Sequence, residues 1–130
     1  MTQDQLLSML QTFGEAWNRH DIEALMACMH EACVFEGVAG PLACGVRHEG
    51  PAAVRKAFEA AWQTMPDAAW RNARCWVSGD RGVMESTFTG TTPDGSRIEA
   101  DMVDLLTFKD GKILIKNAFR KQRPPLPAQA

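Results

Sequence analysis

Residues 97–121, RIEADMVDLLTFKDGKILIKNAFRK, decide the fold, because apolar and polar residues alternate on both sides of a short turn. Asp110 and Gly111 at the centre form a strong signal for a tight hairpin turn. Two further segments with the same period of two precede this hairpin, and they are joined by turns rich in glycine, proline and aspartate. The pattern therefore predicts four antiparallel strands, over residues 70–78, 83–91, 97–108 and 112–121.

Before residue 66 the apolar residues recur at helical spacing instead. A first helix carries Leu6, Leu10, Phe13 and Trp17 on one face, Asp21 caps a second helix, and a third runs from Pro51 to Pro66. A short strand over 33–36 and a loop over 37–50 lie between them. We expect an α+β fold, with three N-terminal helices packed on a strongly curved, mainly antiparallel sheet, as in a cone-shaped α+β barrel.

The chain has 130 residues, 14 Lys and Arg, 16 Asp and Glu, and a net charge of −2, so we expect one domain. We place it at residues 1–123, with 124–130 as a proline-rich mobile tail that cannot join the sheet. The balanced charge gives no electrostatic reason for binding nucleic acid or a membrane. We expect a cytoplasmic protein, because the N-terminus does not read as a secretory signal. The chain has no tyrosine, which excludes any mechanism that needs a phenol donor.

Asp104 is the residue of greatest chemical interest. It is the single carboxylate on the even-numbered face of residues 97–108, which is otherwise apolar. Burial destabilises an unpaired carboxylate, so Asp104 could serve as general base, general acid or neutral hydrogen-bond donor. Two structural alternatives stay open. Asp104 could pair with a buried arginine or amide, or a bulge could turn it to solvent.

Two histidines are candidates for a proton shuttle beside Asp104. His30 is expected at the end of the second helix, where a cavity mouth could lie, and His48 in the loop before the third helix. A zinc site is a weaker interpretation, because the spacing of the candidate ligands is irregular; they are Cys28, His30, Cys33, Cys44 and His48. The four cysteines form no CxxC pair, and we expect them to be reduced.

Large apolar side chains could hold a flat hydrophobic ligand, although part of the set must be core. The candidate substrate-binding residues are Phe13, Trp17, Phe35, Phe58, Trp62 and Met102. The motifs that bind nucleotides or mark common hydrolases are missing from the sequence, so we expect no cofactor and no metal.

Several stretches resemble the SnoaL-like branch of the nuclear transport factor 2-like superfamily. Their order and spacing carry the resemblance, which spans most of the chain; they are residues 13–21, 34–36, 50–55, 89–91, 103–108 and 110–113. The resemblance implies a cone-shaped domain with a deep apolar pocket for a hydrophobic small molecule. It also implies a homodimer packed through the sheet. Relatives include steroid isomerases, polyketide cyclases, dehydratases, epoxide hydrolases and non-enzymatic binding proteins, so the fold alone does not identify a reaction.

The resemblance also suggests what Asp104 does. Asp104 is similar in position to the protonated pocket acid of steroid isomerases, but Gly37 and Phe13 stand where those enzymes have a base and a tyrosine. Polyketide cyclases of the SnoaL type rely on a pocket aspartate and need no tyrosine. The resemblance therefore favours a cofactor-independent cyclase or isomerase that moves a proton on a hydrophobic carbonyl substrate.

Two other functions stay open. A non-catalytic ligand-binding protein or dimeric association module would explain why two isomerase groups are missing. An epoxide hydrolase would need an arginine beside Asp104, and Arg74 and Arg120 are the candidates.

Overall fold

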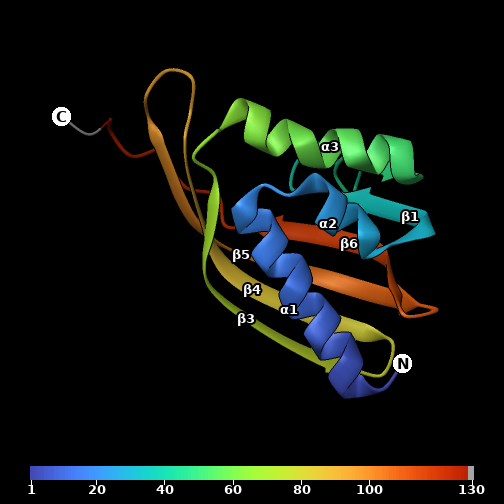
Figure 1. Ribbon diagram of the computed structural model, residues 1–130. Helices are drawn as coiled ribbons and strands as arrows, with labels where there is room; N and C mark the ends of the chain where they lie inside the picture. Colours follow the sequence, from blue (N-terminus) through green and yellow to red (C-terminus); the bar gives the residue numbers. More distant parts are fainter. Residues whose placement is uncertain (129–130) are drawn as a thin grey trace.

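The computed structural model describes residues 1–128, which form helices on one side of a curled sheet (Figure 1). The helices are α1 (Gln3–Arg19), α2 (Ile22–Ala27) and α3 (Pro51–Thr64). The strands are β1 (Met29–Glu36), β2 (Arg47–Glu49), β3 (Ala69–Ser78), β4 (Arg81–Thr91), β5 (Arg97–Lys109) and β6 (Lys112–Arg120).

The helices begin where the sequence predicts them. Thr2 and Gln5 form a capping box at the start of α1, and the Asp21 side chain accepts a hydrogen bond from the Ala24 amide at the start of α2. Pro51 is the first residue of α3, where its missing N–H costs nothing.

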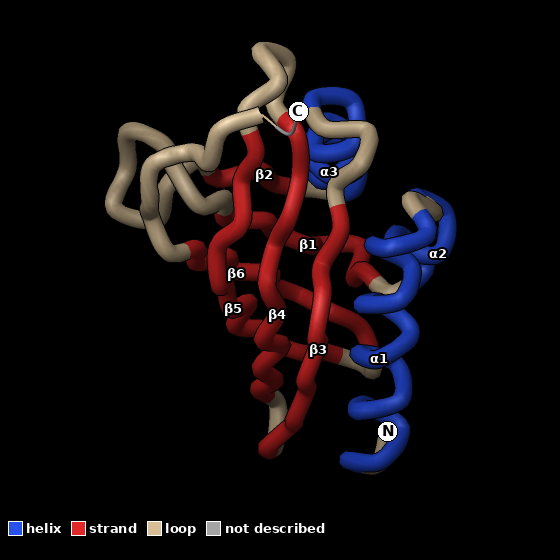
Figure 2. The backbone as a smooth tube through the Cα atoms, turned by 90° about the vertical axis from the view of Figure 1, so that its left-hand side faces the viewer, coloured by secondary structure: helices blue, strands red, loops and turns tan. Residues whose placement is uncertain are grey.

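The strands form one six-stranded sheet in the order β2-β1-β6-β5-β4-β3. Strands β1 and β6 are parallel, and the other neighbouring pairs are antiparallel. Figure 2 shows the helices in a layer against one face of this sheet. The predicted α+β class is confirmed, with a sheet that is curled but does not close into a barrel.

One irregularity in the β5–β6 hairpin controls which residues face the helices. Near the turn, Phe108 is opposite Ile113, but the next pair is Thr107 opposite Ile115, so Leu114 is an extra residue in β6. A bulge of this kind changes the face on which every later residue of its strand lies. Beyond Leu114, the even-numbered residues of β6 therefore lie on the same face as the even-numbered residues of β5.

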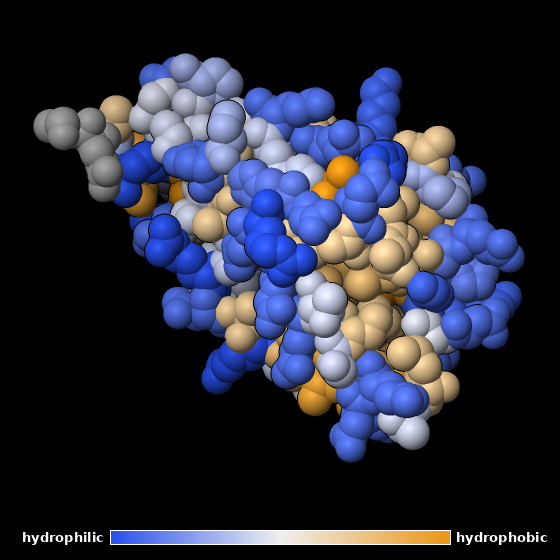
Figure 3. Space-filling view, in the orientation of Figure 1, coloured by the Kyte–Doolittle hydropathy of each residue, from blue (hydrophilic) through white to orange (hydrophobic). Residues whose placement is uncertain are grey.

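The core lies between the helices and the even-numbered face of β4 and β5, which we call the inner face. Its completely buried large side chains come from all three helices and from strands β5 and β6; they are Leu10, Phe13, Leu25, Val54, Phe58, Leu106 and Ile113. Figure 3 shows apolar residues gathered in the middle of the helix-bearing side, with hydrophilic residues around them. The odd-numbered residues of β4 and β5 lie on the opposite, outer face, which none of the described helices covers.

Three sequence expectations need correction. The first strand begins at Met29, so His30 lies in β1 rather than at the end of α2. Within the expected loop over 37–50, residues 47–49 form the edge strand β2. Leu126 exchanges two backbone hydrogen bonds with Arg97, so the segment expected outside the sheet joins its end at one residue. Prolines flank Leu126 but leave its own amide free to donate. Residues 129–130 of the expected tail lie outside the described residues.

Candidate functional site

Asp104 is buried on the inner face of β5 and forms an ion pair with Lys116 of β6. The Lys116 Nζ atom donates a hydrogen bond to Asp104 Oδ1 at 3.1 Å. The Asp104 and Lys116 side chains are only 4% and 5% exposed. The pair forms because the bulge at Leu114 places Lys116 on the inner face, diagonally across from Asp104. Of the two structural alternatives, the buried partner is correct, but it is a lysine rather than an arginine or amide.

Aromatic rings surround the lysine end of this pair. The Lys116 Nζ atom lies 4.7 Å from the ring centre of Phe35, 5.1 Å from Trp17 and 5.8 Å from Phe58. Ring faces attract a cation, and this attraction grows when water is excluded. The rings come from β1, α1 and α3, so three separate elements position the ammonium group beside Asp104.

A small cavity of 10 Å³ lies beside Asp104, enough for about one water molecule. It is lined by residues of α1 and of strands β3, β4 and β5: Gly14, Trp17, Trp70, Ala73, Met84, Ser86 and Asp104. Gly14 and Ala73 also line a surface groove of 590 Å³ between α1 and β3. These two small residues are therefore shared between the buried carboxylate and a solvent-facing groove.

Two indole groups in the interior have no hydrogen-bond acceptor among residues 1–128. They are the Nε1 atoms of Trp17 and Trp62, and both atoms are buried. An unpaired buried donor costs free energy, so such groups in a folded protein call for an explanation. The described interior thus contains two unpaired N–H donors and one ion pair among its aromatic rings.

The two candidate histidines occupy different places. His30 Nδ1 accepts a hydrogen bond from the Ala32 amide, and His30 Nε2 lies 3.5 Å from Asp110 at the β5–β6 turn. His48 stacks on Phe35 with ring centres 5.6 Å apart, and Phe35 in turn contacts Lys116. The structure thus brings His48 within one ring of the buried pair, whereas His30 contacts the hairpin turn.

The candidate substrate-binding residues divide between core and site. Phe13 and Phe58 are completely buried and pack edge to face with each other. Trp17 and Phe35 contact the ammonium group, as described above. Trp62 is partly buried and stacks on His20. Met102 lies on the inner face of β5, two residues before Asp104, opposite Arg120 of β6.

Sequence reasoning missed Lys116 and considered Arg120 as a possible partner of Asp104. Arg120 lies on the inner face, with its guanidinium carbon 4.9 Å from the Phe88 ring centre, and burial lowers its pKa. The alternation of charged and apolar residues over 116–120 was visible, but an ideal turn at 110–111 would pair Asp104 with Asn117. Only the bulge at Leu114 reverses that assignment.

The structure also bears on two weaker hypotheses. Among residues 1–128, no group of three His, Cys, Asp or Glu side chains is arranged to hold a metal ion. Neither Arg74 nor Arg120 pairs with Asp104, whose described ionic partner is Lys116, while Arg74 lies 4.0 Å from Glu85. We therefore drop the epoxide hydrolase hypothesis.

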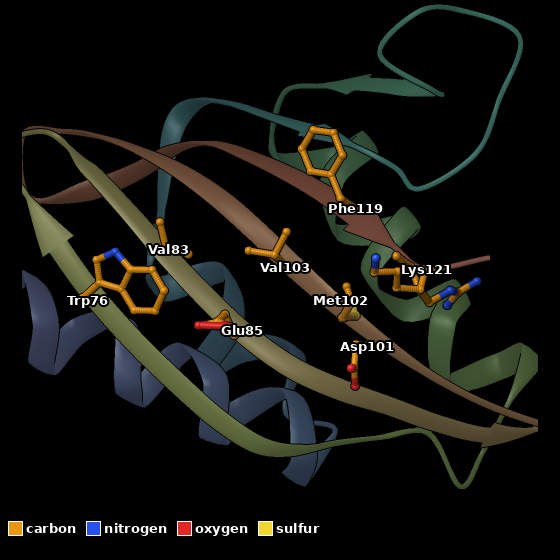
Figure 4. A pocket seen from close by; sticks show the side chains of 9 residues that line it. Trp76, Val83, Glu85, Asp101, Met102, Val103, Phe119 and Lys121 are labelled. Atoms are coloured by element: carbon orange, nitrogen blue, oxygen red, sulfur yellow. The ribbon is translucent and has the colours of Figure 1, made fainter. Parts of the chain in front are cut away.

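The outer face carries a second candidate site, an open apolar groove of 520 Å³ (Figure 4). Trp76 and Phe119 are each 48% exposed there, an unusual exposure for side chains of this size. Val83 and Val103 lie between them, and Glu85, Asp101 and Lys121 add charges at the lower and right side of the same view. This face combines an apolar centre with a polar rim.

Comparison with known proteins identifies the family. The SnoaL-like domain matches residues 10–115. A candidate polyketide cyclase from Xanthomonas campestris pv. campestris has a similar structure, with 20% identity, a TM-score of 0.79 and 90% of each chain covered. An NTF2-like protein of unknown function from Mesorhizobium loti has 26% identity and a TM-score of 0.76, with 92% of this chain and 93% of that chain covered.

A candidate isomerase from Bacillus subtilis has 17% identity and a TM-score of 0.76, with 93% of this chain and 90% of that chain covered. A search of curated protein sequences found no match. No helix among residues 1–128 is long and apolar enough to cross a membrane. With the match over residues 10–115, this chain belongs to the SnoaL-like domain family, and it shares its fold with the NTF2-like protein from Mesorhizobium loti.

Proposed function

We propose that the protein is a cofactor-independent enzyme that moves a proton on a hydrophobic carbonyl substrate, as a cyclase or isomerase does. The buried Asp104–Lys116 pair is the observation that carries this proposal. A carboxylate and an ammonium group held 3.1 Å apart among aromatic rings provide a base and a cationic donor in one water-poor site. Ionisable groups so placed are more often functional than those on a surface.

The two groups have complementary tasks in the proposed reaction. Asp104 takes a proton from the carbon next to the substrate carbonyl and returns it to another carbon after the bonds rearrange. The carbonyl oxygen becomes negatively charged in between, and Lys116 donates a hydrogen bond to it. The unpaired N–H of Trp17 is a second hydrogen-bond donor near Lys116. His48, which stacks on Phe35, exchanges protons between the site and solvent.

The substrate must be apolar around its carbonyl group, because aromatic rings line the space around Lys116. The cavity of 10 Å³ is smaller than such a molecule, so binding requires side chains to move. Trp62 and Trp70 are the partly buried rings beside Trp17, and their displacement would enlarge the cavity.

The test uses 2-tetralone, a bicyclic ketone with an acidic C–H beside its carbonyl group. We expect the wild-type protein to accelerate exchange of that hydrogen in D₂O, followed by NMR. Asp104→Asn should lose this acceleration, whereas Asp101→Asn, three residues away on the outer face, should keep it. Thermal melting of the three proteins checks their folding. Full acceleration by folded Asp104→Asn contradicts the proposal, as does a wild-type protein that gives no acceleration.

A second function is supported by the outer face: association of two copies of this chain through the sheet. The exposed Trp76 and Phe119 side chains and the groove between them would be covered in such a homodimer. We expect a dimer in sedimentation equilibrium and a monomer for Phe119→Asp, with Ala60→Asp, at an exposed position of α3 on the helix-bearing side, as the control. A monomeric wild-type protein contradicts the dimer and leaves the enzyme proposal unaffected.

A further inference from the structure

The inner face of the sheet carries an unequal number of positive and negative groups. Its ionised side chains on β4, β5 and β6 beyond the bulge are Asp104, Lys116 and Arg120, because the other even-numbered positions there are uncharged. Asp104 and Lys116 neutralise each other at 3.1 Å. Arg120 is left as one positive charge that the sheet itself does not balance.

Arg120 has no carboxylate partner among residues 1–128. Each arginine ion pair of the described chain involves an arginine other than Arg120. The guanidinium group of Arg120 instead lies over the Phe88 ring, 4.9 Å from its centre. Phe88 is itself buried, so the contact draws the guanidinium group toward the interior. Arg120 is partly buried, and this burial lowers its pKa.

Arg120 and Asp104 are close enough to contact one small molecule. Arg120 follows Ala118 by two residues in β6, and Ala118 is directly opposite Asp104. The backbone position of Arg120 is therefore about 7 Å along the strand from the Ala118–Asp104 pair. Aromatic rings connect the two places without a gap, since Phe88 packs on Trp70 and Trp70 on Trp17, which contacts Lys116.

We propose that the ligand of this site is an anionic hydrophobic molecule whose carboxylate binds Arg120. In a substrate, the carbonyl group would then lie at Asp104 and Lys116, so the substrate class is a hydrophobic keto acid. This assignment deepens the proposed function and rests on it for the carbonyl end. A guanidinium group matches a carboxylate with two parallel hydrogen bonds, and an anionic ligand would balance the charge of the inner face.

The test compares two probes that differ only in charge, 3-phenylpropanoate and 3-phenylpropanamide. Neither can undergo the proposed reaction, so binding is measured apart from turnover, by calorimetry and by quenching of tryptophan fluorescence. We expect the wild-type protein to bind the carboxylate about tenfold more tightly than the amide, the effect of one charge-assisted hydrogen bond.

Variants at two arginines locate the effect. Arg120→Gln should bind both probes equally, and Arg120→Lys should retain part of the preference. Arg123→Gln is the matched control, because Arg123 donates to the Glu99 carbonyl on the exposed end of the sheet, and it should retain the full preference. Melting temperatures show that the variants are folded.

Equal binding of both probes by the wild-type protein overturns this inference, as does binding of neither. A preference that survives in Arg120→Gln also overturns it. If the carboxylate preference depends on Arg120 but Asp104→Asn still accelerates exchange in 2-tetralone, the anion site stands and the proposed proton transfer fails. If the exchange depends on Asp104 but the two probes bind equally, the proposed proton transfer stands and the anion site fails.

Discussion

Two ion pairs between neighbouring strands lie on opposite faces of the sheet, Lys116–Asp104 inside and Arg74–Glu85 outside, and they differ in almost every physical respect. On the inner face, Lys116 and Asp104 are 3.1 Å apart and only 5% and 4% exposed. On the outer face, Arg74 and Glu85 are 4.0 Å apart and 79% and 41% exposed. Water solvates the outer charges, whereas the inner charges depend on each other and on the rings around them.

The comparison shows that burial decides how much stability depends on an ion pair between two strands of one sheet. An exposed ion pair contributes little to the free energy of folding, because water solvates each charged group almost as well as the partner does. A buried pair has already lost its hydration, and its attraction repays that loss only while both partners are present. Stability alone is therefore a weak explanation for the buried pair, which agrees with the proposed role of Asp104 in proton transfer.

The largest expected effect comes from breaking the inner pair. Lys116→Met leaves Asp104 buried without a partner, and we expect the free energy of unfolding at neutral pH to fall by about 3–5 kcal/mol. Urea denaturation measures this change. The double variant Asp104→Leu with Lys116→Met should recover most of the loss, because no unpaired charge remains. A loss below about 1 kcal/mol in the single variant would show that water reaches Asp104.

A smaller effect is expected where the inner face is closely packed. A Cβ atom at Gly82 of β4 would lie 2.7 Å from Cζ of Phe108 and 3.3 Å from Cδ2 of Leu10. We expect Gly82→Ala to reduce stability by about 1–3 kcal/mol, as other overpacked cores do. Adding Phe108→Leu removes the closest ring atoms, so the double variant should lose less than the sum of both single changes. Additive losses would mean that the backbone moves instead.

Breaking the outer pair should have almost no effect. Arg74→Met removes a largely exposed guanidinium group, and we expect stability to change by about 0–1 kcal/mol, less at high salt. Urea denaturation at low and high salt measures both parts of the prediction. A loss comparable to that of Lys116→Met would remove the distinction between the two faces.

In contrast to the buried Asp104, Asp94 in the turn between β4 and β5 is an exposed carboxylate that local hydrogen bonds stabilise. Hydrogen bonds from Thr92 and Ser96 lower the pKa of Asp94 from 3.8 to about 2. Because the folded value is the lower one, these bonds stabilise the protein above pH 3.8, and the contribution disappears as the pH falls toward 2. NMR titration should show the low midpoint, and Thr92→Val should raise the pKa toward 3.8. An unchanged midpoint in that variant would assign the effect to Ser96 alone.

Much of the fold could be predicted because its signals are local. Helix caps at Thr2 and Asp21, Pro51 at the start of α3 and the turn at Asp110-Gly111 act within a few residues of themselves. The missed elements depend on distant partners. Strand β2 exists because residues 47–49 pair with the end of β1, and Leu126 joins the sheet through Arg97.

The sequence by itself determined that Asp104 lies on an apolar strand face, that no tyrosine is available and that helices precede an antiparallel sheet. Only the tertiary structure decided what Asp104 meets. One extra residue, Leu114, turns Lys116 and Arg120 toward the helices and Asn117 away from them. A strand alternates its faces at every residue, so a bulge that adds one residue reverses the side of all that follow, and no local pattern in β6 reveals where that residue is.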